Sequence, residues 1–253
     1  MELFDLNGRV AVVTGGNGGI GLGLARGLAK AGAALSIWGR NEEKNAAARA
    51  ELEAFGARAH ALRCDVSKPE EIANAVEATV QAMGRIDIGF ANAGFGTIAS
   101  SLTITPEEWQ QVTAVDLDGA FFTFRELAKH MKERGEGGKL IGIGSIGEIY
   151  GMPRQAAYSA SKGALAAMIR SLAVELARYD IQVNLIQPGW IETDATGALL
   201  QWEAMDKTIR HRTPARRWGT PEDLEGIAVY LASDASRFHT GDTIRVDGGY
   251  SVF

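Results

Sequence analysis

The chain of 253 residues is 46% hydrophobic and 23% charged, which is typical of a folded globular protein and excludes a disordered or low-complexity chain. A net charge of −5 without any basic run argues against nucleic acid as a partner. Cys64 is the only cysteine, so an internal disulfide is excluded, and the scattered histidines predict no metal site. The chain carries no secretory signal at its start and no run of ~18 apolar residues, so we expect a cytoplasmic protein that does not enter a membrane.

Short apolar runs alternate with longer helical patterns along the whole chain. The runs predicted as strands are Val10–Val13, Leu35–Trp38, Ala59–Leu62, Ile86–Phe90, Leu140–Ile143, Val183–Ile186 and Thr243–Val246. The helical patterns lie near 19–31, 41–55, 69–83, 106–133, 155–179 and 221–232. Nearly continuous apolar runs are typical of strands that are buried on both faces of a parallel sheet. The pattern therefore predicts an α/β fold, a doubly wound (Rossmann-type) seven-stranded parallel sheet with helices on both faces.

No linker or change in composition divides the chain, so we expect a single domain over residues 1–253. The long connection at 190–214 follows the carboxyl end of a predicted strand and separates it from the last helix. Such a connection is a natural place for a substrate lid.

The first predicted strand runs directly into a glycine-rich loop that opens the first helix. Gly15, Gly19 and Gly21 follow a G-x-x-x-G-x-G spacing. Glycines allow a tight turn and let backbone N–H groups approach a pyrophosphate at the helix N-terminus. The loop lacks the Lys-Ser/Thr ending of a P-loop, which disfavours nucleotide hydrolysis. It predicts a dinucleotide site, with a purely structural turn as the alternative.

The end of the second predicted strand bears on the choice of dinucleotide. It reads Gly39-Arg40, without the acid that would bind the ribose hydroxyls of NAD. Gly39 leaves room there, and the Arg40 guanidinium could bind a 2′-phosphate. NADP(H) is therefore the preferred cofactor and NAD(H) the second choice, unless Arg40 merely pairs with Glu42 or Glu43.

Tyr158 and Lys162 lie four residues apart in a predicted helix, so their side chains leave the same face. An ammonium close to a phenol favours its ionised form, which suits a general acid/base. Ser145 ends the fifth predicted strand, at the edge where ligands bind in such sheets. Taken singly, each of these residues also fits an ordinary helix surface or turn.

Together these motifs resemble the short-chain dehydrogenase/reductase family in its single-domain form, over essentially the whole chain. The resemblance also rests on Asn92-Ala93-Gly94, on Pro188-Gly189 and on the stretches 217–222 and 246–249.

The resemblance implies roles for individual residues. Tyr158 would be the general acid/base, Lys162 would bind the nicotinamide ribose, and Ser145 would position the carbonyl. The residues implied to bind the cofactor are Gly15, Asn17, Gly19, Ile20, Gly21, Arg40, Asp65, Val66, Asn92, Ala93, Gly94, Tyr158, Lys162, Pro188, Gly189, Ile191 and Thr193.

One position departs from the family pattern. Asp116 stands where the family usually carries an Asn that anchors a water leading to the lysine. If the backbone carbonyl holds this water, Asp116 can serve in the catalytic set. We expect the proton relay to survive with Asp116 in this place, and its carboxylate to favour charged Lys162.

The sequence leaves the substrate open. The candidates for the substrate pocket are Phe95, Ile146, Glu148, Gln155, Trp190 and Trp202. Their apolar and aromatic members favour an NADP(H)-dependent ketone reductase or alcohol dehydrogenase, which is the leading hypothesis. Glu148 and Gln155 suit a sugar or sugar-acid dehydrogenase instead, and a 3-oxoacyl thioester reductase is a third enzymatic reading. The alternative from another class is a non-catalytic NADP(H)-binding sensor.

The small residues of the 155–179 helix permit close helix contact, and family members commonly pair such helices. We expect a homotetramer, with a dimer as the alternative.

Overall fold

Seven parallel strands form one sheet in the computed structural model, which describes residues 2–253. The strands are β1 (Val10–Thr14), β2 (Ala34–Gly39), β3 (Ala59–Arg63), β4 (Ile88–Ala91), β5 (Gly138–Ile143), β6 (Ile181–Pro188) and β7 (Thr243–Val246). They lie in the order β3-β2-β1-β4-β5-β6-β7, and each pairs in parallel with its neighbours. The predicted doubly wound sheet is confirmed.

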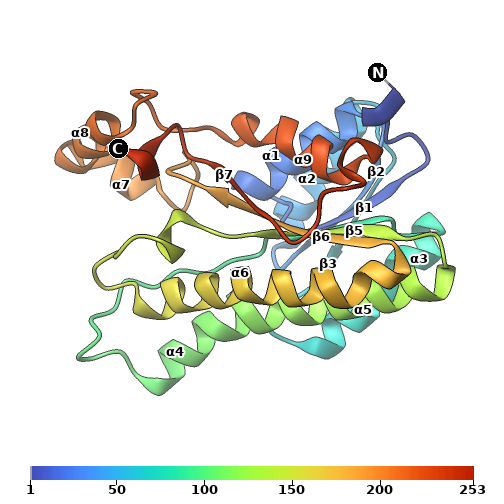
Figure 1. The fold of residues 1–253 in the computed structure, drawn as a ribbon, viewed down its shortest axis with the longest axis horizontal. Helices are drawn as coiled ribbons and strands as arrows, with labels where there is room; N and C mark the ends of the chain where they lie inside the picture. The colour runs from blue at the N-terminus through green and yellow to red at the C-terminus, as the bar shows by residue number, and fades with distance from the viewer. Residues whose placement is uncertain (1) are drawn as a thin grey trace.

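Helices cover both faces of this sheet (Figure 1). The α-helices are α1 (Gly19–Lys30), α2 (Glu42–Ala54), α3 (Pro69–Met83), α4 (Pro106–Thr113), α5 (Gly119–Arg134), α6 (Ala156–Leu176), α7 (Gly197–Gln201), α8 (Glu203–Arg212) and α9 (Glu225–Ala232). Helices α1, α2 and α9 lie on one face, and α3, α5 and α6 on the other. The short 3₁₀ segments are Glu2–Phe4, Ile146–Glu148, Ala177–Tyr179, Pro221–Leu224, Asp234–Ser236 and Tyr250–Val252.

The alternation of side chains along β1 explains why both faces need helices. Val12 points into the apolar cluster on one face, whereas Ala11 and Val13 belong to the cluster on the other. All three are completely buried. Because successive strand residues face opposite sides, a strand without polar positions is stable only between two layers of helices.

The chain reverses direction across the sheet between β1 and β4. From β1 it builds β2 and β3 outward on one side, and it then returns to add β4 and the later strands on the other. The connections that leave β1 and β4 therefore diverge at their carboxyl ends and open a crevice. The Asn92 side chain bridges this point by donating to Thr14 O (2.8 Å) and Gly15 O (3.2 Å).

The predicted helix over 106–133 is interrupted. Between α4 and α5 the chain forms a π-helical segment, Ala114–Asp118. The i→i+5 bonding of such a segment leaves no mark in a 3.6-residue hydrophobic pattern, so the sequence did not predict it. Two further differences are that β4 begins at Ile88 rather than Ile86, and that the 190–214 connection contains α7 and α8.

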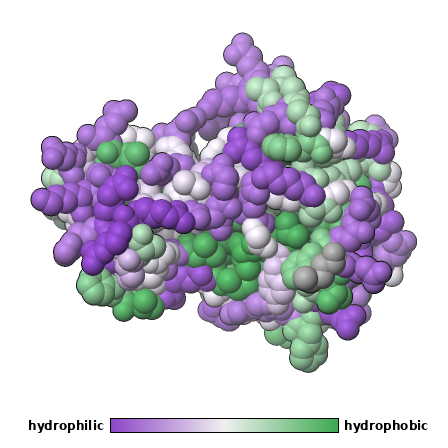
Figure 2. Space-filling view, turned by 90° about the horizontal axis from the view of Figure 1, so that it is seen from above, coloured by the Kyte–Doolittle hydropathy of each residue, from purple (hydrophilic) through white to green (hydrophobic). Residues whose placement is uncertain are grey.

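Polar side chains cover much of the face seen in Figure 2, with apolar residues gathered in separate patches. Over residues 2–253, no helix has both the length and the hydropathy that a membrane crossing requires.

Candidate active site

A cleft of about 810 Å³ lies at the carboxyl ends of the central strands. Every residue that the sequence predicts for the cofactor lines it, and so does Ser145. In open parallel sheets ligands bind at this edge, where the strand order reverses. The cleft is therefore the candidate site.

The glycine loop supplies a bare backbone at the bottom of the cleft. Gly15 and Gly19 have φ angles of 63° and 50°, which side chains other than glycine rarely adopt. A Cβ on Gly21 would overlap Gly15 O and Asn92 Nδ2. Because the turn requires glycine at these positions, its backbone N–H groups stay accessible, so the loop and the first turn of α1 fit a pyrophosphate, as a dinucleotide requires.

The end of β2 differs in one respect from the sequence prediction. The space beside Gly39 is filled, because a Cβ there would overlap Asn17 Nδ2 and lie 2.5 Å from Asn45 Oδ1. These two side chains form a hydrogen bond in which Asn17 Nδ2 donates to Asn45 Oδ1 (2.6 Å). Gly39 thus accommodates a pair of amides from the protein itself.

Arg40 follows at the mouth of the cleft and is exposed. No carboxylate among residues 2–253 lies within 4.0 Å of its guanidinium, so the alternative pairing with Glu42 or Glu43 is not formed. Lys44, in the first turn of α2, also lines the cleft and binds Asp194 with an N–O distance of 3.0 Å. The sequence prediction missed Lys44, and because Arg40 lies before α2, no helical spacing pointed to it.

Ser145, Tyr158 and Lys162 meet at the other end of the cleft. A Cβ on Gly147 would lie 3.3 Å from Ser145 Oγ and 3.5 Å from Tyr158 Cε1, so the hydroxyl and the ring both lie close to Gly147, as does the Met152 methyl group at 2.6 Å. Lys162 Nζ lies 5.6 Å from the centre of the Tyr158 ring and donates to Ile143 O (3.0 Å). The lysine is 4% exposed, so its ammonium acts on the phenol through little solvent.

Asp116 lies behind this group, in the π-helical segment, and does not line the cleft. The Phe95 N–H donates to its Oδ1 (2.6 Å), whereas Oδ2 is buried without a partner among residues 2–253. Burial raises the pKa of the Asp116 carboxyl, against the opposing effects of the Lys162 ammonium and the Phe95 N–H.

The predicted substrate residues divide into two groups. Phe95, Ile146, Gln155 and Trp190 line the cleft. Trp202 does not, because it lies between α7 and α8 with 62% of its surface exposed.

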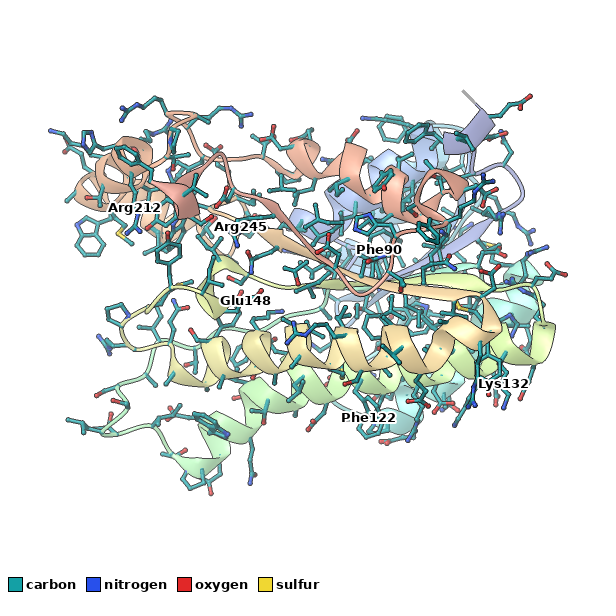
Figure 3. The ribbon with its side chains drawn as sticks, viewed as in Figure 1. Phe90, Phe122, Lys132, Glu148, Arg212 and Arg245 are labelled. Atoms are coloured by element: carbon teal, nitrogen blue, oxygen red, sulfur yellow. The ribbon has the colours of Figure 1, made fainter. Side chains whose placement is uncertain are left out.

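Glu148 is also absent from the lining of the cleft, although its Oε2 would lie 3.0 Å from a Cβ on Gly144, which does line it. It accepts a hydrogen bond from Gln187 Nε2 on β6, and Arg245 Nε on β7 donates to Gln187 Oε1 (2.6 Å). Glu148 and Arg245 lie between the middle of the molecule and the end that carries α7, α8 and Arg212 (Figure 3). Burial raises the pKa of the Glu148 carboxyl, although the Gln187 amide opposes this effect.

The same chain of polar contacts reaches the last residues. Arg245 donates to Ser251 Oγ (2.7 Å), and Tyr150 Oη donates to Ser251 O (2.6 Å). The Arg212 guanidinium lies 4.6 Å from the rings of both Tyr150 and Tyr250.

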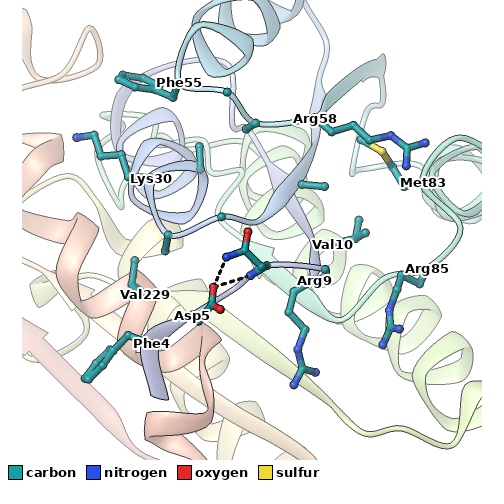
Figure 4. A pocket seen from close by; sticks show the side chains of 18 of the residues that line it. Phe4, Asp5, Arg9, Val10, Lys30, Phe55, Arg58, Met83, Arg85 and Val229 are labelled. Carbon is teal, nitrogen blue, oxygen red and sulfur yellow. Dashed lines mark hydrogen bonds between the residues drawn. The ribbon is translucent and has the colours of Figure 1, made fainter. Parts of the chain in front are cut away.

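A second hollow, of about 1060 Å³, lies near the start of β1 (Figure 4). Three of its basic side chains form ion pairs: Arg9 with Asp234, Lys30 with Glu225 and Arg85 with Asp87. The fourth, Arg58, donates to the carbonyl oxygen of Ala82. The hollow carries no convergent catalytic groups, so we assign the site to the cleft. In the part of the chain that the structure describes, no three His, Cys, Asp or Glu residues are grouped to hold a metal ion.

Comparison with known proteins gives matches over nearly the whole chain. A family model described as enoyl-(acyl carrier protein) reductase matches residues 15–251. Gluconate 5-dehydrogenase of Gluconobacter oxydans is 37% identical over 251 residues, which cover 99% of this chain and 98% of the relative. The 5-keto-D-gluconate 5-reductase of Escherichia coli is 39% identical over 251 residues, with 99% and 98% covered. A crystal structure of gluconate 5-dehydrogenase from Burkholderia cenocepacia in complex with NADP and tartrate superposes with a TM-score of 0.95 at 40% identity, covering 100% of this chain and 98% of that one.

Proposed function

Since the chain belongs to the short-chain dehydrogenase/reductase family, and is therefore an oxidoreductase of CH–OH groups, we propose that it interconverts a keto sugar acid and its hydroxy acid with NADP(H). The observation that carries this proposal is the sequence identity with relatives that act on sugar acids. The relatives named above are a gluconate dehydrogenase and a ketogluconate reductase, and their identity extends over 98% of their own length. This identity favours the sugar-acid alternative over the leading expectation of a hydrophobic ketone.

The residues at the end of β2 support NADP(H) over NAD(H). Arg40 forms no ion pair with a carboxylate among residues 2–253, so its guanidinium is available for a 2′-phosphate, whereas Lys44 nearby is paired with Asp194. Three solved relatives contain NADP, at 36–40% identity. When bound, the nicotinamide supplies or accepts the hydride.

For the remaining chemistry we assign one role to each of three side chains. Tyr158 gives its phenolic proton to the ketone oxygen during reduction and takes it back during oxidation. The Ser145 hydroxyl donates a hydrogen bond to the same oxygen and fixes its position. Lys162, anchored on Ile143 O, holds a positive charge beside the phenol and so stabilises the phenolate.

Residues 190–214 are the proposed lid over the substrate. Trp190 and Leu199 line the cleft from this segment, and Lys44 binds Asp194 within it.

We also propose a cytoplasmic homotetramer. Support for self-association comes from the small residues of α6 and from the exposed Val174 on its surface. Light scattering after size exclusion would test the assembly.

The decisive experiment is NADPH oxidation with a panel of carbonyl substrates. The panel contains 5-keto-D-gluconate, other keto sugar acids, aryl ketones and a 3-oxoacyl thioester. We expect the highest kcat/KM with a keto sugar acid, and a loss of about 10²- to 10⁴-fold in Tyr158→Phe because a general acid is removed. A higher kcat/KM with an aryl ketone or thioester would refute the substrate class. NADPH binding without turnover of any substrate would favour a sensor.

A further inference from the structure

A sugar acid brings a negative charge to the substrate end of the cleft, and the segments that form this end carry a single basic residue besides Lys162. The segments are 94–98, 143–155 and 188–199. Their acidic residues are Glu148, Glu192 and Asp194, and Arg154 is their only lysine or arginine. A carboxylate that leaves water for a pocket needs a cation or several N–H groups to meet it, so Arg154 is the candidate for this contact.

The other cations in and around the cleft are engaged elsewhere. Arg40 lies at the end of β2, where the 2′-phosphate is proposed to bind, and Lys44 nearby is paired with Asp194. Lys162 Nζ donates to a backbone carbonyl of β5 (3.0 Å). Arg212 does not line the cleft, and its guanidinium packs against two tyrosine rings, 4.6 Å from the centre of each.

Arg154 lies at the rim of the cleft, between two of the loops that line it. Met152 and Gln155, on either side of it in the sequence, both line the cleft. Its carbonyl oxygen accepts a hydrogen bond from the Ala99 N–H (2.9 Å), in the loop that follows β4. Its φ angle is 65°, a value that residues other than glycine rarely adopt. Arg154 is exposed, and its guanidinium makes no ion pair or hydrogen bond with residues 2–253, so it is available to a ligand.

We propose that Arg154 determines specificity by binding the carboxylate of the substrate, in the bidentate manner typical of arginine and carboxylate. Arg154 lies just ahead of α6, four positions before Tyr158. A substrate whose ketone meets Tyr158 therefore has Arg154 at the same end of the cleft for the carboxylate at the far end of its carbon chain. This inference rests on the proposed function and names the residue that separates a keto sugar acid from an uncharged ketone.

The test compares two ketones that differ in one group. L-sorbose has the carbon chain and the ketone of 5-keto-D-gluconate, with an alcohol in place of the carboxylate. We expect Arg154→Gln to lower kcat/KM for 5-keto-D-gluconate about 10- to 100-fold, mainly through KM, because charge-assisted hydrogen bonds to the carboxylate are lost. The loss for L-sorbose should stay below ~2-fold. Arg154→Lys keeps the charge without the planar fork and should recover part of the loss.

Arg216→Gln is the matched control, because Arg216 is also exposed, has a φ angle of 58° and does not line the cleft. It should leave kcat/KM for both ketones unchanged. The Kd for NADPH, measured by fluorescence, should be the same in all variants. If Arg154→Gln is unstable, Arg154→Gly replaces it, since glycine suits the positive φ. If L-sorbose reacts too slowly to measure, the best uncharged ketone of the carbonyl panel takes its place.

Equal losses for the two ketones in Arg154→Gln, or no loss for either, would overturn the inference and leave the proposed function intact. A selective loss for 5-keto-D-gluconate in Arg212→Gln, without one in Arg154→Gln, would also overturn it, because the carboxylate would then bind another cation. If the unsubstituted enzyme has a higher kcat/KM for an uncharged ketone than for every keto sugar acid, the proposed function fails and the inference fails with it.

Discussion

Replacing Gly21 by Ala tests the claim that the cofactor loop depends on a bare backbone. Gly21 is the third residue of α1, and its φ lies outside the left-handed region, so the backbone itself accepts alanine. The obstacle is the added methyl group, which would overlap Gly15 O and Asn92 Nδ2 and would lie 2.9 Å from the Gly15 carbonyl carbon. The substitution therefore disturbs the bridge across the sheet as well as the loop.

The magnitude follows from these contacts. Asn92 Nδ2 makes two hydrogen bonds, to Thr14 O and Gly15 O, each contributing about 0.5–1.5 kcal/mol. Overpacking costs a further 1–3 kcal/mol or so. Alanine recovers about 1 kcal/mol of helix propensity. The net loss is about 1–5 kcal/mol of unfolding free energy, which lowers Tm by roughly 2–20 °C in a chain of this size.

The assay combines calorimetry with NADPH binding by fluorescence. We expect Gly21→Ala to melt at the lower temperature and to bind NADPH at least ~10-fold more weakly, because the displaced Gly15 carbonyl distorts the preorganised turn. Gly226→Ala in α9 is the matched control. A Cβ there meets nothing within 4 Å, so its Tm should be unchanged or slightly raised. If Gly21→Ala matched the control in both Tm and NADPH affinity, the reasoning about the loop would be refuted.

Three further substitutions test other parts of the molecule. Arg40→Ala should raise the Kd for NADPH by about 10- to 100-fold, because charge-assisted hydrogen bonds to the 2′-phosphate are lost. The Kd for NADH should stay the same. An equal rise in both Kd values would contradict the assignment of Arg40 to the 2′-phosphate. Lys139 is 8% exposed, and burial lowers its pKa from 10.5 to about 8. Between these two pH values the unfolded chain binds a proton on Lys139 and the folded protein does not. The free energy of unfolding therefore rises with pH across this window. Lys139→Met should therefore be more stable than the unsubstituted protein by about 1–2 kcal/mol at pH 7, an advantage that denaturant titrations should find shrinking toward pH 10.5. Trp190→Ala should lower kcat/KM at least ~10-fold in steady-state kinetics, whereas Trp202→Ala, at an exposed position, should lower it by less than ~2-fold. Similar losses in the two variants would mean that the lid closes further over the cleft than the structure indicates.

The sheet and the cofactor end of the cleft were predictable from the sequence for a physical reason. Strands buried on both faces are apolar throughout, and the residues predicted to bind the cofactor follow directly after them. Gly15 after β1, Asn92 after β4 and Gly189 after β6 all line the cleft as predicted. Once the strands are located, the positions of these residues follow from the parallel sheet.

The residues that the sequence misplaced depend on side-chain packing, which has no local signal. Gly39 was read as open space, whereas the Asn17–Asn45 pair occupies it from two other segments. Glu148 is close to Ser145 in sequence, yet its side chain turns toward β6 because Gln187 offers it a hydrogen bond. Trp202 falls on the outer side of the lid because α7 ends and α8 begins beside it. The outcomes at Gly39 and Glu148 are decided by tertiary contacts between distant segments, and that at Trp202 by the boundary between two short helices.

The polar contacts between the loop after Ser145 and the last residues of the chain have a practical consequence for engineering. Tyr150 and Ser251 are 101 positions apart, yet one hydrogen bond of 2.6 Å joins them, and Arg212 lies against the rings of Tyr150 and Tyr250. The loop that contains Tyr150, the C-terminal residues 250–253 and the end of α8 are thus joined by direct contacts. Directed-evolution libraries aimed at new substrates need not be confined to cleft-lining positions, since the tail offers a route to the same loop that leaves the reacting groups intact.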